Sequence, residues 1–522
     1  MSWRPPPPPR IEDRIRIERD GTFTALSGKV DFGQGIRTAF AQIVADELDV
    51  PFASVQVVLG DTSRSPYDFG TYGSQSIHVE GSNLRNAAAA ARAILLARAS
   101  ARLGADARDL EIAAGTVRAK RGGSSVTYSE LATEGPLDGP VPEGIATKSA
   151  DELRLVGTSV PRREGRDIVT GRPVYVTDVR LPGMLRGAVL RPPHMGAALR
   201  ELDDAAASPL PGVIKVVRDG DFVGVVAERH EQALAAVAVL RAVWDPTPPS
   251  RGVEHDIELR RDDGIDEALA SAKSSLEAAY TLPYLANAPI GPSGAVADVK
   301  SDSATIYSGS QRPFGLRSQI AQLLGLDESR VHVVPSRSSG TYGRNNNDDA
   351  PGEAARLSRA VGKPVLVQWT REDEFAYGTL RPAAFIEAKA GLASDGRVAA
   401  WSYRVTTHAH ILAPVENAQI AAVTAGSGAL PTYDIPKAEI QLHIEKSEVR
   451  TSSFRSLAGA ENVFAIESLM DELAVLASVD PVEFRLRHVS DERFAAVMRI
   501  VAQRSGWTSG RAPTGRGFGC PA

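Results

Sequence analysis

The pattern of apolar and polar residues predicts a strand–turn–helix–strand unit near the start of the chain. Residues 22–29 alternate as in a half-buried strand, and residues 31–35 form a glycine-bearing turn. A helix is predicted next, because apolar side chains recur at helical spacing at Ile36, Phe40, Ile43, Val44 and Leu48. The unit is completed by a short strand, a Gly-rich loop, a long Ala-rich helix and a Pro- and Gly-rich boundary, at 55–59, 60–76, 83–103 and 135–143.

A second unit follows, with short strands separated by turns. The strands and the one helix are predicted at 174–176, 187–190, 212–217, 222–226 and 231–243. The Pro- and charge-rich segment 245–264 ends this unit, which is typical of a small α+β domain.

The third unit alternates strands with helices. The strands are predicted at 304–308, 331–334 and 365–369, and the helices at 316–324, 352–361 and 462–477. Asp480 should cap a further helix, with Glu483 placed for a capping box. We therefore expect an α+β fold, divided into a Pro-rich tail and three domains at 1–14, 15–145, 150–250 and 270–522.

The composition is that of an ordinary globular protein. Hydrophobic residues make up 43% and charged residues 24%, so disorder is not expected. The net charge of −5 and a pI near 6.1 give no basic domain for a nucleic-acid partner. The chain has neither an apolar run long enough to span a bilayer nor the apolar core of a secretory signal. The sequence therefore predicts a cytoplasmic protein, unless a partner carries it to a membrane.

The cysteine count limits the redox chemistry of this chain. It holds one cysteine, Cys520, whereas a cysteine-ligated iron–sulfur cluster normally uses four thiolates. Electrons from any redox reaction must therefore leave through another subunit or a bound organic cofactor.

Two glycine-bearing turns lie between a strand and a helix, at Gly33-Gln34-Gly35 and Gly340-Thr341-Tyr342-Gly343. Such turns direct backbone N–H groups and the positive end of a helix at a phosphate or another anion. Neither has the spacing of the dinucleotide fingerprint or of the P-loop. A tight turn that needs glycine for its backbone angles is the alternative interpretation.

Other polar segments permit binding chemistry without requiring it. The loop Thr71–Ser76 could hydrogen-bond a polar heterocycle or be an ordinary solvated loop. The cluster 345–349 lacks the spacing of a calcium loop, so Asp348 or Asp349 is better interpreted as a helix N-cap. His408 and His410 have no third ligand nearby in sequence, and no metal site is predicted. Arg455 precedes a helix and is ambiguous alone.

Five segments in one order resemble the molybdopterin-binding large subunit of the xanthine dehydrogenase and aldehyde oxidase family. They are Gly28–Gly35, Thr71–Ser76, Gly309–Gln311, Ser339–Arg344 and Phe454–Arg455. A glycine–glutamine–glycine segment ahead of the small domain is similar to the isoquinoline 1-oxidoreductase and nicotinate dehydrogenase branch. The stretches at 158–185, 462–474 and 480–488 look like family segments too. The resemblance implies two molybdenum-cofactor-binding lobes flanking a small hammerhead-like domain.

The resemblance also implies roles for individual residues. Gln34 and the N–H groups of Gly33 and Gly35 would hold the cofactor near its phosphate or dithiolene end, and Gln311 would lie beside an oxo ligand of molybdenum. Tyr342 and Arg455 would border the metal. Further cofactor contacts are expected from Thr71, Gly73, Ser74, Gln75, Ser76, Gly340, Gly343 and Arg344. No side chain would ligate molybdenum directly.

The implied reaction is hydroxylation of an N-heteroaromatic or aldehyde carbon with oxygen from water. The cofactor would be molybdenum–molybdopterin, with or without a cytosine dinucleotide. Electrons would pass to a [2Fe–2S] small subunit and then to a flavin or cytochrome c subunit, so that iron–sulfur, FAD and haem belong to partner subunits only.

The sequence also departs from the family pattern. Ser338-Ser339 stand where relatives have glycines, and Ser456-Leu457-Ala458-Gly459 replace a more glycine-rich turn. The family's general base, a glutamate in a Gly-x-Gly-Glu context, has no counterpart up to residue 522. The alternatives are a separate chain that supplies the C-terminal lobe, a truncated protein, and a non-catalytic scaffold subunit.

Overall fold

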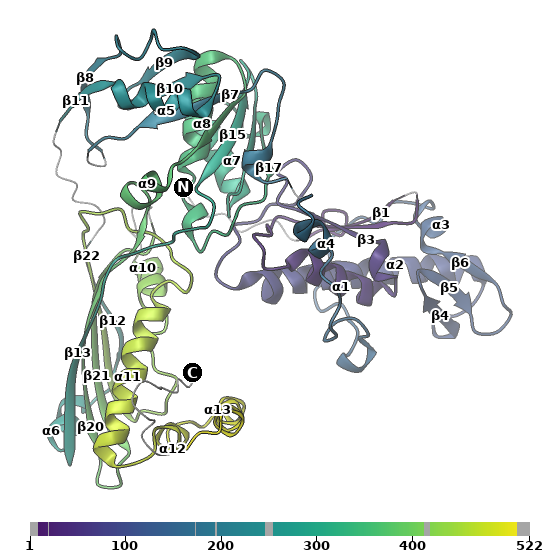
Figure 1. The fold of residues 1–522 in the computed structure, drawn as a ribbon. Helices are drawn as coiled ribbons and strands as arrows, with labels where there is room; N and C mark the ends of the chain where they lie inside the picture. The colour runs from purple at the N-terminus through teal and green to yellow at the C-terminus, as the bar shows by residue number, and fades with distance from the viewer. Residues whose placement is uncertain are drawn as a thin grey trace.

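The computed structural model describes residues 9–508 except 19, 173, 194–195, 246–253 and 412–417. Within these residues the chain forms a mixed α+β fold of three bodies, shown in Figure 1. Most of the predicted Pro-rich tail and the segment with Cys520 lie outside the described residues.

The N-terminal body is a small sheet covered by two long helices. In the sheet, β1 pairs antiparallel with β2 and β2 pairs in parallel with β3. A parallel pair needs a crossover connection, which α1 supplies, and α2 packs against α1 in the same core. The elements are β1 (Ile15–Ile17), β2 (Phe23–Ser27), α1 (Ile36–Leu48), β3 (Val55–Leu59), the π-helix η2 (Ser76–Gly81), α2 (Ser82–Leu103), β4 (Leu110–Ala113), β5 (Thr116–Ala119), β6 (Ser125–Thr127) and α3 (Tyr128–Ala132).

A seven-stranded sheet in the order β17-β16-β15-β18-β7-β10-β9 joins the second and third predicted domains. The junction is the parallel pair β18–β7, and Leu357 of α8 lies where a Cβ at Gly187 of β7 would stand. Helix α8 covers β15 and β18. The elements are β7 (Leu185–Leu190), β9 (Val213–Asp219), β10 (Phe222–Ala227), β15 (Gly294–Val299), β16 (Ala304–Ser308), α7 (Pro313–Leu324), β17 (Val331–Pro335), α8 (Asp349–Val361) and β18 (Val365–Gln368).

Two predictions for the small domain are wrong. The helix predicted at 231–243 is α5 (His230–Val239), and the residues after it form β11 (Arg241–Trp244), which pairs with β8 (Leu199–Asp203). The strand predicted at 174–176 is absent from the described structure. Tyr175 makes one isolated bridge to Arg337, and Asp178 accepts a hydrogen bond from the Tyr175 N–H at 3.0 Å, which closes the turn η5 (Val176–Asp178).

The third body is a five-stranded sheet in the order β12-β22-β21-β20-β13, with α11 packed on β13 and β20. Strand β12 falls in the predicted linker 245–264 but pairs with β22. The elements are β12 (His255–Arg261), α6 (Ile265–Ala270), β13 (Ser274–Leu282), β20 (Ala384–Leu392), β21 (Val398–His408), α10 (Ala418–Ala425), β22 (Lys437–Glu445) and α11 (Gly459–Ala477).

The remaining elements are short segments or lie near the C-terminal end. Asp480 caps α12, because its carboxylate accepts from the N–H groups of Val482 and Glu483 at 2.9 and 3.1 Å. The predicted capping box is wrong, since Glu483 pairs with Arg487 instead. The bounds are α4 (Gly165–Val169), β14 (Leu285–Ala286), η7 (Arg344–Asn346), α9 (Arg371–Ala376), β19 (Leu380–Arg381), α12 (Pro481–Leu486) and α13 (Glu492–Ser505), with short 3-10 turns at Phe52–Ser54, Ala107–Asp109, Ala150–Glu152 and Glu328–Arg330.

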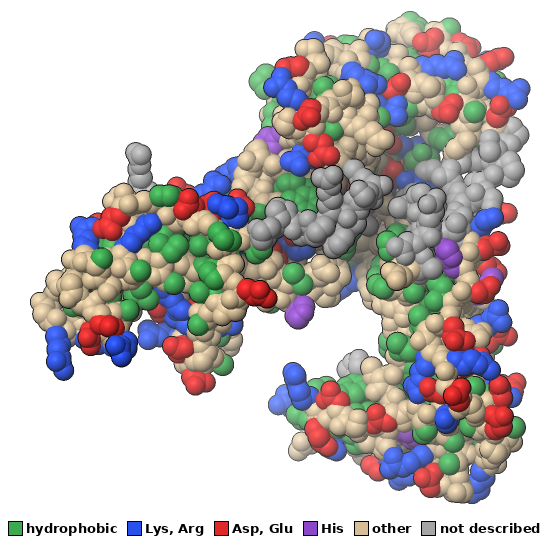
Figure 2. Space-filling model, turned by 180° about the vertical axis from the view of Figure 1, so that it is seen from behind, with side chains coloured by type: hydrophobic (Ala, Val, Ile, Leu, Met, Phe, Trp, Pro, Cys, Tyr) green, Lys and Arg blue, Asp and Glu red, His purple; other side chains and the backbone are tan. Residues whose placement is uncertain are grey.

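The three bodies stand apart at their outer ends, as Figures 1 and 2 show. The N-terminal body and the five-stranded body project from the seven-stranded sheet with open space between them. On the face seen in Figure 2, acidic and basic side chains are interspersed over all three bodies.

Candidate cofactor site

Gln311 lies where the N-terminal body meets the seven-stranded sheet, between β16 and α7. Its Nε2 donates to the Thr71 carbonyl at 3.1 Å, and its own carbonyl accepts from the Thr71 N–H at 2.8 Å. Its backbone N–H donates to the Asn345 carbonyl at 2.9 Å. The side chain is 6% exposed, and its Oε1 has no hydrogen-bond partner among the described residues. Gln311 therefore joins the Thr71–Ser76 loop to Asn345, the residue that follows the predicted Ser339–Arg344 segment.

The turn Gly33-Gln34-Gly35 forms the N-terminal end of α1. Both glycines have positive φ, 118° and 82°, and neither has an atom within 4 Å of where a Cβ would stand. The Asp31 carboxylate accepts from the Gly33 N–H at 2.8 Å and from the Gly35 N–H at 3.4 Å. Gln34 is exposed, and its amide hydrogen-bonds backbone groups of the same turn at 2.6 and 2.9 Å. In this structure a carboxylate of the chain already occupies the helix end that was predicted to bind the cofactor.

A buried lysine holds the first part of the Thr71–Ser76 loop. Lys29, 3% exposed, lies 3.0 Å from the Asp68 carboxylate and donates to the Gly70 carbonyl at 2.6 Å. Beyond this anchor, the side chains of Ser74 and Gln75 are exposed and make no hydrogen bond to the described residues. The loop runs into the π-helix η2, a rare geometry that is frequent at functional sites. These donors are therefore presented to the outside at the start of a long helix.

The Gly340–Gly343 loop packs directly against the segment that precedes Arg455. A Cβ at Gly343 would lie 2.4 Å from the Ser453 carbonyl oxygen, and Gly343 has φ 100°, so only glycine fits there. Tyr342 is 37% exposed with φ 53°, and its ring lies over Gly340. The amide of Asn287 spans the two segments, donating to the Tyr342 carbonyl at 2.7 Å and to the Ser453 carbonyl at 3.2 Å.

The side chain of Arg344 points into the protein interior. It is 1% exposed, donates to Glu374 and Asp349 at 3.2 Å each, and lies over the Trp369 ring at 4.7 Å. Burial acts to raise the pKa of Asp349, yet Arg450 and Arg344 bring it below its usual value. The backbone of Arg344 is paired as well, because its N–H donates to the Thr341 carbonyl at 2.8 Å and its carbonyl accepts from the Asn347 N–H at 3.2 Å.

Arg455 occupies an exposed turn ahead of α11. The Leu457 N–H donates to the Phe454 carbonyl at 2.8 Å, and Ser456 and Leu457 have φ of 81° and 55°, angles that glycine adopts more readily. Beneath this turn Arg381 forms a buried ion pair with Glu461 at 3.0 Å. The guanidinium of Arg455 forms no ion pair with the described residues.

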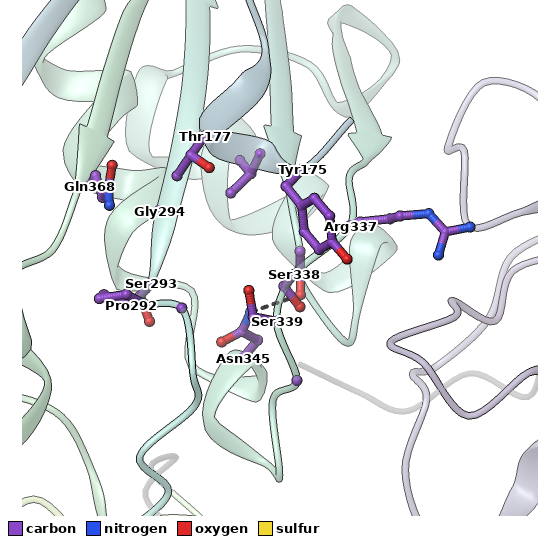
Figure 3. A pocket seen from close by; sticks show the side chains of 14 residues that line it. Tyr175, Thr177, Pro292, Ser293, Gly294, Arg337, Ser338, Ser339, Asn345 and Gln368 are labelled. Atoms are coloured by element: carbon purple, nitrogen blue, oxygen red, sulfur yellow. Dashed lines mark hydrogen bonds between the residues drawn. The ribbon is translucent and has the colours of Figure 1, made fainter. Parts of the chain in front are cut away.

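A small polar cavity lies beside the Gly340 loop and is lined in part by Ser293, Ser338 and Asn345 (Figure 3). Its volume is about 100 Å³, well below the roughly 300 Å³ at which ligand pockets begin. Arg337 points away from it toward the N-terminal body. The cavity therefore cannot enclose a pterin cofactor, which would have to lie along the open surfaces of the loops.

Asp348 is a buried acidic residue beside Arg312, the residue that follows Gln311. Burial raises its pKa to about 6, against the opposing effect of Arg312, whose Nε is 3.2 Å away. It is the N-cap residue of α8 as predicted, but its side chain makes no capping hydrogen bond.

The polar groups at these loops suit an organic cofactor that carries both hydrogen-bond donors and acceptors. The buried Gln311 Oε1 lacks a partner among the described residues and can accept from an N–H or O–H of a ligand, while the exposed Ser74 and Gln75 offer donors and acceptors. No group of three or more His, Cys, Asp or Glu side chains that could hold a metal ion occurs in the described part of the chain.

The structure joins Thr71 to Gln311 by hydrogen bonds, and it packs Gly343 against Ser453, two residues before Arg455. Between these two groups, the Gln311 N–H donates to the carbonyl of Asn345. Gln34 and its glycines stay on the N-terminal body and make no hydrogen bond to these residues in the described structure. Sequence reasoning missed Lys29 and Asn287. Lys29 lies inside the recognised Gly28–Gly35 segment, whereas no motif marks Asn287.

Two family models match this chain. Residues 247–489 and 7–154 each match a family model described as molybdopterin cofactor-binding domain. The chain is 37% identical to a nicotinate dehydrogenase subunit of Pseudomonas putida over 96% of its own length, but covers 45% of that protein. It is 29% identical to the beta subunit of isoquinoline 1-oxidoreductase from Brevundimonas diminuta, covering 73% of it.

Solved structures show the same fold. Quinoline 2-oxidoreductase from Pseudomonas putida 86 superposes with a TM-score of 0.59 at 20% identity, over 67% of this chain and 54% of that one. The aldehyde oxidoreductase of Desulfovibrio gigas gives the same TM-score over 72% and 49%. This chain thus spans about half the length of these proteins. Among the described residues, no helix combines the length and apolar character that a membrane span requires.

Proposed function

Because this chain belongs to the molybdopterin-binding subunits of the xanthine dehydrogenase and aldehyde oxidase family, we propose that it frames the molybdenum site of a hydroxylase. The substrate would be an N-heteroaromatic or aldehyde carbon. In the overall reaction water supplies the oxygen, a C–H bond is replaced by C–OH, and two electrons and two protons leave. The named relatives, a nicotinate dehydrogenase and an isoquinoline oxidoreductase, favour the heteroaromatic class.

The observation that carries this proposal is the junction at Gln311. One buried glutamine joins Thr71 of the N-terminal body to Asn345, two residues after Gly343, and its Oε1 has no partner among the described residues. A buried amide oxygen without a partner costs about 1–3 kcal/mol, so a ligand at this point would relieve that cost.

When bound, the cofactor would supply two-electron redox chemistry and Lewis-acid activation. Gln311 Nε2 gives one N–H to Thr71, and its second N–H would donate to an oxygen of the metal centre, while Oε1 would accept from a donor group of the cofactor. The Thr71–Ser76 loop would hold the pterin. Tyr342 and Arg455 would border the substrate.

The proposal includes partner subunits for electron transfer. A [2Fe–2S] subunit would accept the electrons, and a flavin or cytochrome c subunit would receive them next. This chain has one cysteine, so four-thiolate clusters must be held elsewhere. The two relatives are each named as one subunit of a larger enzyme, which supports a multi-subunit assembly. A cytoplasmic location stays a prediction.

The test is to purify the assembled enzyme that carries this chain with Gln311→Ala and, separately, with Gln34→Ala. We expect Gln311→Ala to slow turnover more than it lowers molybdenum content, and Gln34→Ala to lower molybdenum content. Unimpaired turnover in Gln311→Ala would contradict the role of that amide. A correctly assembled complex that contains molybdenum but is inert toward heteroaromatics and aldehydes would support the scaffold alternative.

A further inference from the structure

Asn287 follows the short strand β14 and is delivered to the candidate site by a fixed backbone. Leu285 and Ala286 pair with β19, and Leu380 of β19 bridges in turn to Thr451. The side chain of Asn287 is 7% exposed. Its position is therefore set by backbone hydrogen bonds and not by a mobile loop.

The amide of Asn287 connects two segments that are distant in sequence. Its Nδ2 donates to the carbonyl of Tyr342 at 2.7 Å and to the carbonyl of Ser453 at 3.2 Å. A primary amide has two N–H groups, so both are used in these contacts. The buried Oδ1 has no partner among the described residues, which shows that the side chain is held by its donors.

The two connected segments are those that carry the predicted metal-site residues Tyr342 and Arg455. They touch directly, because Gly343 leaves no room for a Cβ against the Ser453 carbonyl. Backbone angles on both sides are unusual for residues other than glycine, with φ of 53° at Tyr342 and 81° at Ser456. Such conformations persist only where the surrounding structure holds them.

We propose that Asn287 is a positioning residue that holds the Tyr342 loop and the Arg455 turn at one fixed separation around the metal centre. The proposal rests on the proposed function for what the two loops surround, but the tether itself is a property of this chain. Aspartate has nearly the same shape as asparagine but no N–H group to donate. Its negative charge would face the carbonyl oxygens of Tyr342 and Ser453. Serine removes the amide without adding a charge.

The experiment compares Asn287→Asp and Asn287→Ser with a matched control, Asn462→Asp. Asn462 is also buried, and its Nδ2 also donates to two backbone carbonyls, those of Ser427 at 2.9 Å and Ala425 at 3.4 Å. It has no contact with Tyr342 or Ser453 in the described structure. The control therefore loses the same kind of bridge away from the Tyr342 loop, although Ser427 donates to the Ser456 carbonyl at 3.5 Å and so touches the Arg455 turn.

The first readout is hydrogen–deuterium exchange of segments 340–347 and 450–457 in the assembled enzyme. Loss of two hydrogen bonds should accelerate exchange in both segments together by about 10- to 30-fold in the Asn287 variants. Asn462→Asp should leave segment 340–347 at the wild-type rate, so that it does not accelerate both segments together. Wild-type exchange in both Asn287 variants, or acceleration of one segment alone, would overturn the tether.

The second readout is the Mo(V) electron paramagnetic resonance spectrum with the split of kcat against KM. Asn287→Ser should change the spectrum and lower kcat at least tenfold while molybdenum content stays within twofold. An unchanged spectrum and kcat with faster exchange would overturn the positioning role. A wild-type enzyme without molybdenum would refute the proposed function, and the exchange measurement would still decide the tether.

Discussion

Replacing Arg344 by leucine separates an interior structural role from the cofactor contact that its sequence position suggested. The guanidinium is the only cation paired with Glu374 in the described part of the chain, at 3.2 Å, and the remaining partner of that carboxylate is the Ser293 N–H at 2.5 Å. Asp349 would keep Arg450 at 2.6 Å. The main loss is therefore one buried carboxylate without its counter-ion.

The expected loss of stability follows from the loss of this one buried ion pair. Breaking a buried pair by removing one partner costs about 3–5 kcal/mol. At roughly 2–4 °C per kcal/mol for a domain of this size, the midpoint of thermal unfolding should fall by about 6–20 °C. Arg344→Lys keeps the charge but loses the planar fork, so its shift should be smaller.

Differential scanning calorimetry of Arg344→Leu beside Arg102→Leu measures the effect. Arg102 pairs with Glu134 at 3.1 Å on the surface, with side-chain exposures of 46% and 35%, so its loss should cost less than about 1 kcal/mol. Equal, small shifts in both variants would refute the interior role. Lower molybdenum content in Arg344→Lys without any loss of stability would favour a direct cofactor contact.

Three further predictions concern the loops around the site. Lys29→Met leaves the Asp68 carboxylate without its cation, which should destabilise the 68–76 loop by about 3 kcal/mol and accelerate its amide exchange. Unchanged exchange in 68–76 would show that Lys29 does not anchor this loop. Gly343→Ala forces a Cβ to within 2.4 Å of the Ser453 carbonyl, so molybdenum content of the assembled enzyme should fall severalfold; full occupancy would contradict this packing. Burial raises the pKa of Asp348 to about 6 in the folded protein. Between pH 4 and 6 the unfolded state therefore loses a proton that the folded state keeps. The free energy of unfolding should fall by roughly 3 kcal/mol as the pH rises through this range. Asp348→Asn should abolish this fall, as chemical denaturation at pH 4 and 7 can check, and an undiminished fall would exclude Asp348 as its source.

Local pattern was enough to predict the elements that are decided by nearby residues. The strands at 55–59 and 304–308 and the long helix ending at 103 have the predicted bounds or nearly so, because apolar spacing and glycine caps act within a few residues. The strands β11 and β12 were missed because their partners, β8 and β22, are distant in sequence. The pairing of β18 with β7, which joins two predicted domains in one sheet, was missed for the same reason.

The candidate site shows the same division. Gln311, Thr71 and Tyr342 could be named because they lie in recognisable segments, and the structure joins Gln311 to Thr71 by two hydrogen bonds. Asn287 acts through one amide between two backbone carbonyls, a role that leaves no spacing or motif in the sequence. Arg344 follows a glycine turn that suggests a ligand contact, yet burial against Trp369 and Glu374 directs it inward.

The molybdenum content of the purified complex tests the central claim most directly. Metal analysis of the assembled enzyme should find stoichiometric molybdenum that copurifies with this chain and decreases in Gln34→Ala. A folded complex that carries its iron–sulfur and flavin or haem groups but no molybdenum would contradict the account.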